Sequence, residues 1–285
     1  MAKRLLIICS GVVAMIVALV GGYWLGTAGM IGTPANAADT SGVSSGTELS
    51  QSQDPQVAPS AVESATPSDQ PAPSEPPPAT EPAQPALPPN AKVVYLTFDD
   101  GPDPTWTDQV LGLLKQYDAR GTFFMQGVMV ENYPDVARRV VAAGNRVENH
   151  SYNHPYLTNL SYSSIVDGQL LRTNTVIKNV TGLTPTCVRP PYGATSSGVR
   201  GAIGDTGMTQ QLWDVDPKDW SNPGAERIVD RVMSNVAPGA VVLMHDSGSD
   251  RSQTVSALAQ ILPALKAQGY SFGFACDSAP AKPLP

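Results

Sequence analysis

Polar clusters follow several short apolar runs in the C-terminal two-thirds of the chain, and two of these clusters suit metal chemistry. Asp99 and Asp100 end one run just before Gly101-Pro102, and His150 and His154 follow another run. Residues four apart lie on one side of a helical turn, so both imidazoles can face one ligand. Two histidines and a carboxylate can bind a first-row metal and leave coordination positions open for water and substrate. A solvated Asp-Gly turn and a chance histidine spacing are the alternative interpretations.

Three further clusters follow later apolar runs. Arg189 precedes two prolines, which fix an extended backbone, and its guanidinium can hold a carboxylate by a bidentate contact. Asp219 and Trp220 end an acidic segment, and Leu243 and His245 close the next run. Taken singly, Trp220 and Leu243 fit core packing, and His245 fits a strand-end histidine with satisfied hydrogen bonds. Taken together, five clusters that each end a strand predict a site at one rim of a sheet.

The elements that must position these residues alternate between short apolar strands and amphipathic helices. Seven strands with intervening helices indicate a parallel α/β domain. A barrel is favoured over an open sheet, because no glycine-rich phosphate loop follows the first strand. The predicted strands are 93–98, 122–125, 146–149, 186–189, 210–214, 240–244 and 271–275, and the predicted helices are 107–117, 134–143, 161–180, 195–206, 225–236 and 254–268.

The first 90 residues divide into two segments by composition. In residues 1–37, Lys3 and Arg4 precede a long uncharged apolar stretch, which predicts an N-terminal signal-anchor or signal peptide and an extracytoplasmic domain. Ala35-Asn36-Ala37 suits cleavage and the length of the stretch favours retention as a membrane anchor, so both remain open. Residues 38–90 hold 12 of the 27 prolines and seven acidic side chains without a base, which predicts a disordered acidic linker.

The net charge of −7 therefore belongs mainly to the linker and not to the predicted domain. Residues 91–285 carry 18 acidic and 16 basic side chains, which excludes a strongly basic nucleic-acid interface. This segment is long enough for one hydrophobic core. Its two cysteines, Cys187 and Cys276, are available for a disulfide in an exported protein, but their separation in space is left open.

Together the five clusters resemble the motifs of the polysaccharide deacetylases of carbohydrate esterase family 4. The resemblance covers nearly all of residues 91–275 in order. Glu148 departs from the family pattern, in which a glycine is common before the Asn-His step. The segments similar to the five motifs are 97–102, 150–155, 189–193, 216–220 and 243–245.

The resemblance implies a deformed (β/α) barrel of about seven parallel strands that holds one divalent metal ion. Asp100, His150 and His154 would be its ligands. Zinc is the expected metal, with cobalt and nickel as alternatives. A metal can lower the pKa of water and polarise a carbonyl group, which are two of the three needs of amide hydrolysis.

The resemblance also implies the proton-transfer residues. Asp99 would be the general base that takes a proton from the attacking water, and Arg189 would orient it. His245 would be the acid that protonates the leaving amine, held in place by Asp219. A histidine kept charged by a carboxylate suits this last role.

Three residues would contact the substrate. The backbone N–H of Tyr192 would stabilise the oxyanion, and Trp220 and Leu243 would line a small pocket for the acetyl methyl group. The expected function is removal of N-acetyl groups from N-acetylglucosamine in cell-wall peptidoglycan by a monomeric enzyme. A chitooligosaccharide deacetylase, an acetylxylan esterase and a non-catalytic glycan-binding module are the alternatives.

Overall fold

The computed structural model describes residues 82–83, 85–87 and 90–276. The predicted leader (1–37) and most of the predicted linker (38–90) lie outside these residues, so both stay predictions. Within the described part, none of the helices combines the length and the apolar character that crossing a bilayer requires.

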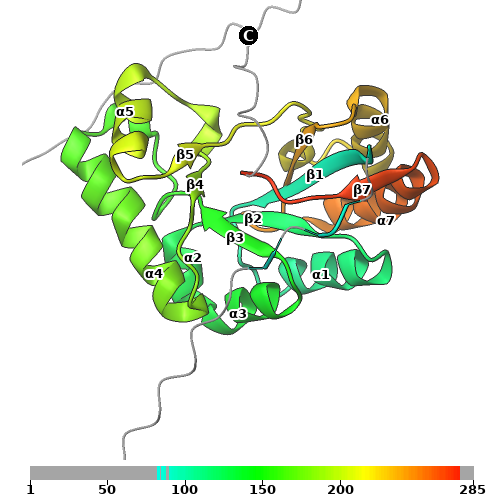
Figure 1. Cartoon of the computed structure of the whole chain (residues 1–285), viewed down its shortest axis with the longest axis horizontal. Coiled ribbons are helices and arrows are strands. Elements are labelled where there is room, and N and C mark those ends of the chain that lie inside the picture. Colours follow the sequence, from blue (N-terminus) through cyan, green and yellow to red (C-terminus); the bar gives the residue numbers. More distant parts are fainter. Residues whose placement is uncertain (1–81, 84, 88–89, 277–285) are drawn as a thin grey trace, which may run out of the picture. The chain divides into compact units, whose positions relative to one another are not determined.

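A parallel sheet forms the centre of the domain (Figure 1), as the alternating pattern predicts. Within the described residues it has seven strands in the order β5-β4-β3-β2-β1-β6, with β7 paired to the first residues of β1. The strands are β1 (Lys92–Asp99), β2 (Gly121–Met125), β3 (Arg146–Asn149), β4 (Cys187–Val188), β5 (Thr209–Gln210), β6 (Val241–His245) and β7 (Tyr270–Phe272).

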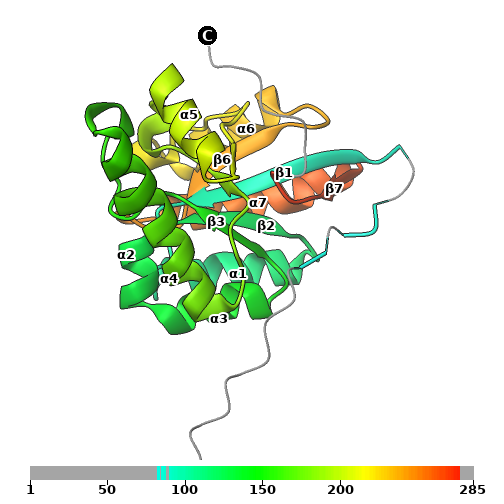
Figure 2. The same ribbon diagram turned by 60° about the vertical axis from the view of Figure 1, so that its left-hand side comes forward.

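Helices surround the sheet (Figures 1 and 2) and follow one another around it, because α6 contacts α7, α7 contacts α1, and α1 contacts α3. The α-helices are α1 (Trp106–Gln116), α2 (Gly127–Asn132), α3 (Pro134–Ala142), α4 (Arg172–Thr181), α5 (Ser197–Asp205), α6 (Ala225–Asn235) and α7 (Ser252–Ala267). Short 3₁₀ turns cover Leu157–Asn159, Pro191–Gly193 and Asp219–Ser221, and a π-helix covers Ser164–Leu171.

The central strand β1 separates the hydrophobic core from a polar interior. Val94, Leu96 and Phe98 are fully buried in the core cluster that also includes residues of α1, α6 and α7. Each such side chain contributes roughly 1.5–3 kcal/mol through removal of apolar surface from water. The alternate residues Thr97 and Asp99 are also buried, but they contact polar partners inside the curved sheet. One face of β1 therefore packs in the hydrophobic core, and the other face contacts the polar residues of the site.

The sheet curves into a half-barrel and does not close through a continuous ladder. A single bridge joins Val215, in the segment after β5, to Val242 of β6. Asp214 and Val215 both donate their amides to the Val241 carbonyl, at 2.9 and 3.1 Å. The prediction of a deformed barrel of parallel strands is therefore confirmed in this half-barrel form.

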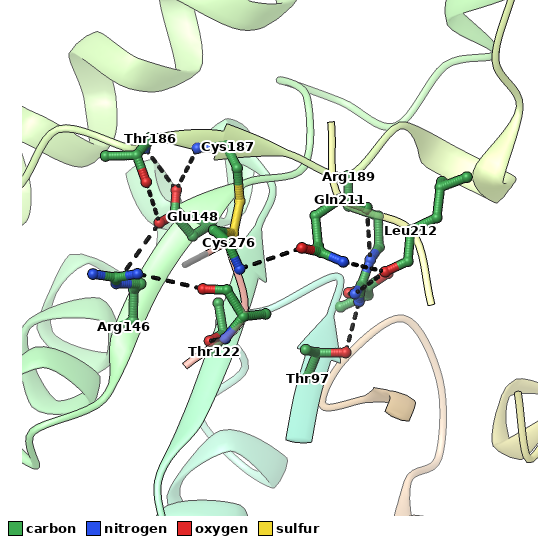
Figure 3. Close-up of a disulfide and its surroundings, with 12 residues drawn as sticks. Thr97, Thr122, Arg146, Glu148, Thr186, Cys187, Arg189, Gln211, Leu212 and Cys276 are labelled. Atoms are coloured by element: carbon green, nitrogen blue, oxygen red, sulfur yellow. Dashed lines mark hydrogen bonds and ion pairs between the residues drawn. A yellow bond between two sulfur atoms is a disulfide. The ribbon is translucent and has the colours of Figure 1, made fainter. Parts of the chain in front are cut away.

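Residues 275–276, after β7, contact β2, β3 and β4 near the first residues of these strands. The Ala275 amide donates to Thr122 Oγ1 at 3.0 Å, and Arg146 Nη1 donates to the Ala275 carbonyl at 3.3 Å. Cys276 forms a disulfide with Cys187 of β4, the pairing that the sequence left open (Figure 3). This segment therefore links the last strand to the sheet edge that β4 and β5 form.

Glu148 of β3 stabilises the short strand β4. Its buried carboxylate accepts hydrogen bonds from the amides of Thr186 and Cys187 at 2.8 and 2.9 Å (Figure 3). Burial raises the pKa of Glu148 to about 7, although both amides and the nearby Arg146 act in the opposite direction. The departure from the family pattern thus concerns strand packing, because Glu148 contacts two backbone amides of the β4 segment, the Thr186 hydroxyl and Arg146.

Two predicted elements differ from the observed ones for identifiable reasons. The strand predicted at 210–214 ends at Gln210, because the Gln211 and Leu212 carbonyls accept hydrogen bonds from a buried guanidinium instead of a neighbouring strand. The helix predicted at 161–180 begins with π-helical turns. There Asn149 Nδ2 donates to the Leu170 carbonyl, and a side chain that inserts in this way widens a helix.

The disulfide should contribute measurably to stability. It closes a loop with a sequence separation of 89 residues, so its removal in a Cys187→Ala/Cys276→Ala variant should lower the free energy of unfolding by about 4 kcal/mol. Urea denaturation followed by circular dichroism measures this change. A reducing agent should destabilise the wild type and leave the double variant unaffected. Equal stability of reduced and oxidised wild type would contradict the prediction.

Candidate active site

The parallel register brings the predicted site residues to one rim of the half-barrel. Asp99, the last residue of β1, pairs directly with His245, the last residue of β6. His150 follows β3 and donates its amide to the Met125 carbonyl of β2, at 2.9 Å. Arg189 follows β4 and donates its amide to the Asn149 carbonyl of β3, at 3.0 Å. Side chains far apart in the chain thus become neighbours because their strands end together.

A cavity of about 400 Å³ opens at this rim. All of the predicted site residues line it except Arg189 and Asp219, which are fully buried and contact Asp99 and His245. The lining residues are Asp99, Asp100, His150, His154, Tyr192, Trp213, Asp216, Trp220, Leu243 and His245. The cavity is large enough for one sugar residue with its substituents.

Asp100, His150 and His154 form a group whose donor atoms lie within 4.8 Å of one another. Asp100 Oδ1 is 3.6 Å from His150 Nε2 and 3.3 Å from His154 Nε2. Burial acts to raise the pKa of Asp100, but the neighbouring histidines and a hydrogen bond from Gln126 outweigh it, so the pKa is lowered. Burial and the nearby His150 lower the pKa of His154 and favour its neutral form, which is the form that binds metals.

The hydrogen bonds of His150 also fit a metal ligand. Its Nδ1 lies 2.7 Å from the Arg189 carbonyl, an acceptor only, so Nδ1 carries the proton. Nε2 then presents a lone pair toward Asp100 and His154. A ligand histidine whose other nitrogen donates to a carbonyl is a common arrangement in metal sites. The donor set therefore fits one divalent metal ion.

Unusual backbone conformations occur at and beside this group. Asp100, Ser151 and His154 have φ values of 78°, 64° and 61°, in the left-handed region that residues other than glycine seldom adopt. Strain of this kind persists where surrounding contacts enforce it, and it often accompanies function. The neighbouring Gly101 meets a second constraint, because a Cβ there would lie 2.6 Å from Asp246 Oδ1.

Arg189 holds Asp99 from inside the half-barrel. Its Nη1 donates to Asp99 Oδ1 at 2.7 Å. The same Nη1 donates to Thr97 Oγ1 at 2.8 Å, and Nη2 donates to the Leu212 carbonyl at 3.1 Å (Figure 3). The guanidinium also lies 4.1 Å from the ring centre of Phe124. Burial lowers the pKa of Arg189, and the charge of Asp99 opposes this change. The second oxygen of Asp99 is 3.7 Å from His150 Nε2, so it lies beside the three possible metal ligands.

Asp219 holds His245 through both of its oxygens. Oδ1 lies 2.8 Å from His245 Nδ1, and Oδ2 accepts from the His245 amide at 2.8 Å. Thr254 of α7 donates its hydroxyl to the same Oδ2 at 2.9 Å. Burial acts to lower the pKa of His245, but the charge and hydrogen bond of Asp219 outweigh it and raise the pKa to about 9. His245 is therefore positively charged at neutral pH.

The three predicted substrate-contacting residues all line the cavity, with different exposure. Leu243 is 3% exposed, whereas Tyr192 and Trp220 are 55% and 53% exposed. Tyr192 has a φ of 61°, and the next residue, Gly193, packs against Trp213 so closely that a Cβ would lie 2.7 Å from the indole ring. The turn that carries Tyr192 is thus fixed by the indole beneath it.

Sequence reasoning missed four contributors to this geometry. Trp213 and Asp216 line the cavity, Gln126 donates to Asp100, and Thr254 donates to Asp219. Trp213 and Asp216 stand in the same polar cluster as Asp219, so their position in the sequence carried a signal. Gln126 immediately follows β2, a strand end at which no charged residue draws attention. The position of Thr254 carried no signal in the sequence, because it is an ordinary residue of an amphipathic helix.

A fixed carboxylate and a charged histidine beside a metal-type donor set suit the hydrolysis of an acyl bond, and similarity to known proteins supports this class. Residues 86–211 match a family model described as polysaccharide deacetylase. A peptidoglycan-N-acetylglucosamine deacetylase of Bacillus cereus is 45% identical over 192 residues, 65% of this chain and 87% of that protein. A chitooligosaccharide deacetylase of Bradyrhizobium is 39% identical, over 62% of this chain and 86% of that protein.

The similarity extends to a solved structure. The peptidoglycan deacetylase PdaC of Bacillus subtilis superposes with a TM-score of 0.62 and 40% identity, over 67% of this chain and 91% of that structure. The chain spans 38% of the full length of PdaC. The chain belongs to the polysaccharide deacetylases of carbohydrate esterase family 4, and the prediction of an enzyme of this hydrolase family is confirmed.

Metal binding tests the donor set directly. Replacing His150 with alanine removes one of three ligands, so the affinity for zinc should fall by more than the roughly 100-fold that loss of an outer-shell partner can cost. Isothermal titration of the purified protein with zinc, cobalt and nickel measures the affinities. Asp99→Asn is the matched control, because it changes a neighbouring carboxylate outside the ligand set and should retain the metal. Unchanged zinc affinity in His150→Ala would contradict the assignment.

Proposed function

We propose that the protein removes N-acetyl groups from N-acetylglucosamine residues of cell-wall peptidoglycan and releases acetate. The observation that carries this proposal is the arrangement of Asp99 with Arg189, and of His245 with Asp219, around one cavity that also contains a metal-type donor set. Water adds to the acetyl carbonyl, the carbon–nitrogen bond breaks, and acetate and a free amine leave. Each of these changes has a group suited to it in the cavity.

Asp100, His150 and His154 would hold the metal ion. A divalent ion bound there would polarise the acetyl carbonyl and make water more acidic. Zinc is the metal that we propose, because imidazole and carboxylate donors suit it. Cobalt and nickel are the alternatives that the metal titration distinguishes.

Asp99 is the general base. It accepts the proton of the attacking water through Oδ2, while Oδ1 remains bonded to Arg189. This single strong hydrogen bond fixes the orientation of the carboxylate, and Arg189 itself is held by Thr97 and two carbonyls. A base held in one orientation loses little entropy when the reaction begins.

His245 is the acid for the leaving amine. An amine is a poor leaving group unless it is protonated as the carbon–nitrogen bond breaks. His245 is charged at neutral pH, lies in the cavity and has its Nδ1 bonded to Asp219. Nε2 therefore carries the proton that is transferred.

The remaining lining residues position the acetyl group. The backbone N–H of Tyr192 donates to the developing oxyanion. Trp220 and Leu243 contact the acetyl methyl group, and the buried Leu243 gives that end of the cavity its apolar character.

Peptidoglycan is proposed as the substrate on two grounds. A Bacillus cereus relative that is 45% identical to this chain is named for this substrate. The predicted leader and the 38–90 linker would place the domain outside the cytoplasmic membrane, next to the wall. A chitooligosaccharide is the second candidate, because the Bradyrhizobium relative named for it is 39% identical.

Acetate release tests the activity. The purified protein with added zinc should release acetate from peptidoglycan, and Asp99→Asn should reduce the rate by about 10²–10⁴-fold because general-base catalysis is lost. Enzymatic quantification of acetate gives the rates, and mass analysis of muropeptides shows whether the acetyl group is lost from glucosamine. Release from chitooligosaccharides alone would favour the second candidate. Full activity of Asp99→Asn would overturn the base assignment.

The pH dependence tests the acid. His245 acts in its charged form, so the rate should fall as pH rises through its pKa, which Asp219 raises to about 9. Asp219→Asn removes that charge, lowers the pKa of His245 and should move the alkaline limb of kcat/KM to lower pH. Asp216→Asn, at another position lining the cavity, is the matched control and should leave the limb in place. An unshifted limb in Asp219→Asn would exclude His245 as the acid.

A further inference from the structure

Gln211 is a buried polar side chain outside the cavity. It follows β5, is 2% exposed and does not line the cavity. Its Oε1 accepts a hydrogen bond from the Cys276 amide at 3.3 Å, and its Nε2 donates to the Leu212 carbonyl at 3.0 Å (Figure 3). Burial of an amide group is costly unless it makes such bonds. The two bonds link the C-terminal segment to the backbone that follows β5.

The same stretch of backbone binds the guanidinium of Arg189. The Gln211 carbonyl accepts a hydrogen bond from Nε at 3.4 Å, and the Leu212 carbonyl accepts one from Nη2 at 3.1 Å. Both carbonyls lie beyond β5, which ends at Gln210. The Leu212 carbonyl therefore accepts from Arg189 and from the side chain of Gln211, so Gln211 helps to fix the direction in which this carbonyl points.

The disulfide fixes the other end of this series of contacts. Cys276 donates its amide to Gln211, and its sulfur is bonded to Cys187. Cys187 lies two residues before Arg189, in a strand of only two residues. The cross-link therefore reaches Arg189 by two routes, along the backbone of β4 and through the side chain of Gln211 (Figure 3).

The position of Arg189 determines the orientation of Asp99. Nη1 of Arg189 donates to Asp99 Oδ1 at 2.7 Å, which leaves Oδ2 directed toward His150. A misplacement of about 1 Å, caused by a change far from the reacting atoms, can lower a rate by about 100-fold. Contacts that hold Arg189 can therefore affect the rate although they do not touch the substrate.

We propose that Gln211 is a positioning residue that, together with the Cys187–Cys276 disulfide, holds Arg189 where it orients Asp99. This inference rests on the proposed role of Asp99 as the base, and it adds two groups outside the cavity on which the rate depends. Loss of either group should lower kcat and leave KM nearly unchanged, because neither lines the cavity.

Gln211→Met tests the positioning role, because methionine fills a similar volume without making the two hydrogen bonds. Acetate release should show a kcat lower by about 10- to 100-fold, with KM within about twofold of wild type. Cys187→Ala/Cys276→Ala should also lower kcat. Combining the three substitutions should cost less than the product of the separate effects, because residues in one network are not additive.

Val140→Ala is the matched control for stability. Val140 is a fully buried core residue of α3 and does not line the cavity. Its truncation should lower the urea midpoint, because it leaves a small cavity in the core. It should leave kcat within about twofold of wild type. An equal loss of kcat in Val140→Ala and Gln211→Met would overturn the positioning role.

An Asp99→Asn background separates positioning from other effects. Without the base, Arg189 has no catalytic carboxylate to orient, so adding Gln211→Met should change the residual rate by less than about twofold. A full additional loss in this background would overturn the positioning role. Wild-type kcat in both Gln211→Met and the double cysteine variant would also overturn it.

Hydrogen exchange followed by mass spectrometry provides a readout that does not need turnover. Residues 210–214 should exchange faster in Gln211→Met than in wild type, whereas residues 225–235 of α6 should not. Faster exchange at 210–214 in a protein that releases no acetate would support the contact with Arg189 and overturn the proposed function. Unchanged exchange at 210–214 would overturn the positioning role.

Discussion

The ion pair between Arg189 and Asp99 is the interaction on which the rest of the domain depends. An isolated guanidinium that is fully buried would cost several kcal/mol in lost hydration. Thr97 and the carbonyls of two residues after β5 accept three further hydrogen bonds from it, and its guanidinium lies close to the rings of Phe124 and Trp213. These contacts explain why β5 is short and why the chain then returns to β6, where Val215 makes its bridge. The buried Arg189 guanidinium needs hydrogen-bond acceptors, and this need determines the backbone path of the segment after β5.

The parallel register of the strands places other strand-end residues beside this ion pair, at one rim of the half-barrel. Asp99 ends the central strand, so its neighbours on both sides deliver residues to the same rim. The different partners of two histidines then separate their roles. The Arg189 carbonyl next to His150 Nδ1 directs Nε2 of that ring toward Asp100, whereas the carboxylate of Asp219 favours a charged His245. One fold thus supplies a ligand and an acid from the same residue type.

Sequence patterns were sufficient where the signal is local. Strand alternation predicted the seven strands, and polar residues at strand ends predicted five clusters at one rim. The resemblance to the family selected ten residues within those clusters, and their roles stay predictions. Features that depend on contacts between distant segments were not predictable. The Cys187–Cys276 disulfide and the hydrogen bond from Thr254 to Asp219 join positions 89 and 35 residues apart. Helix α2, with six residues, is too short to show a period, and the π-helical turns depend on a side chain from β3.

The division between a buried interior and an exposed rim explains why family membership does not specify the substrate. Arg189, Asp99 and Asp219 are buried and bonded from several elements, so their replacement disturbs both chemistry and packing. Tyr156 and Trp220 are about half exposed, so substitution there costs the fold little. Chemistry is therefore constrained by the interior, whereas glycan preference can change through the rim. Relatives of the same family accordingly carry the names of different glycans.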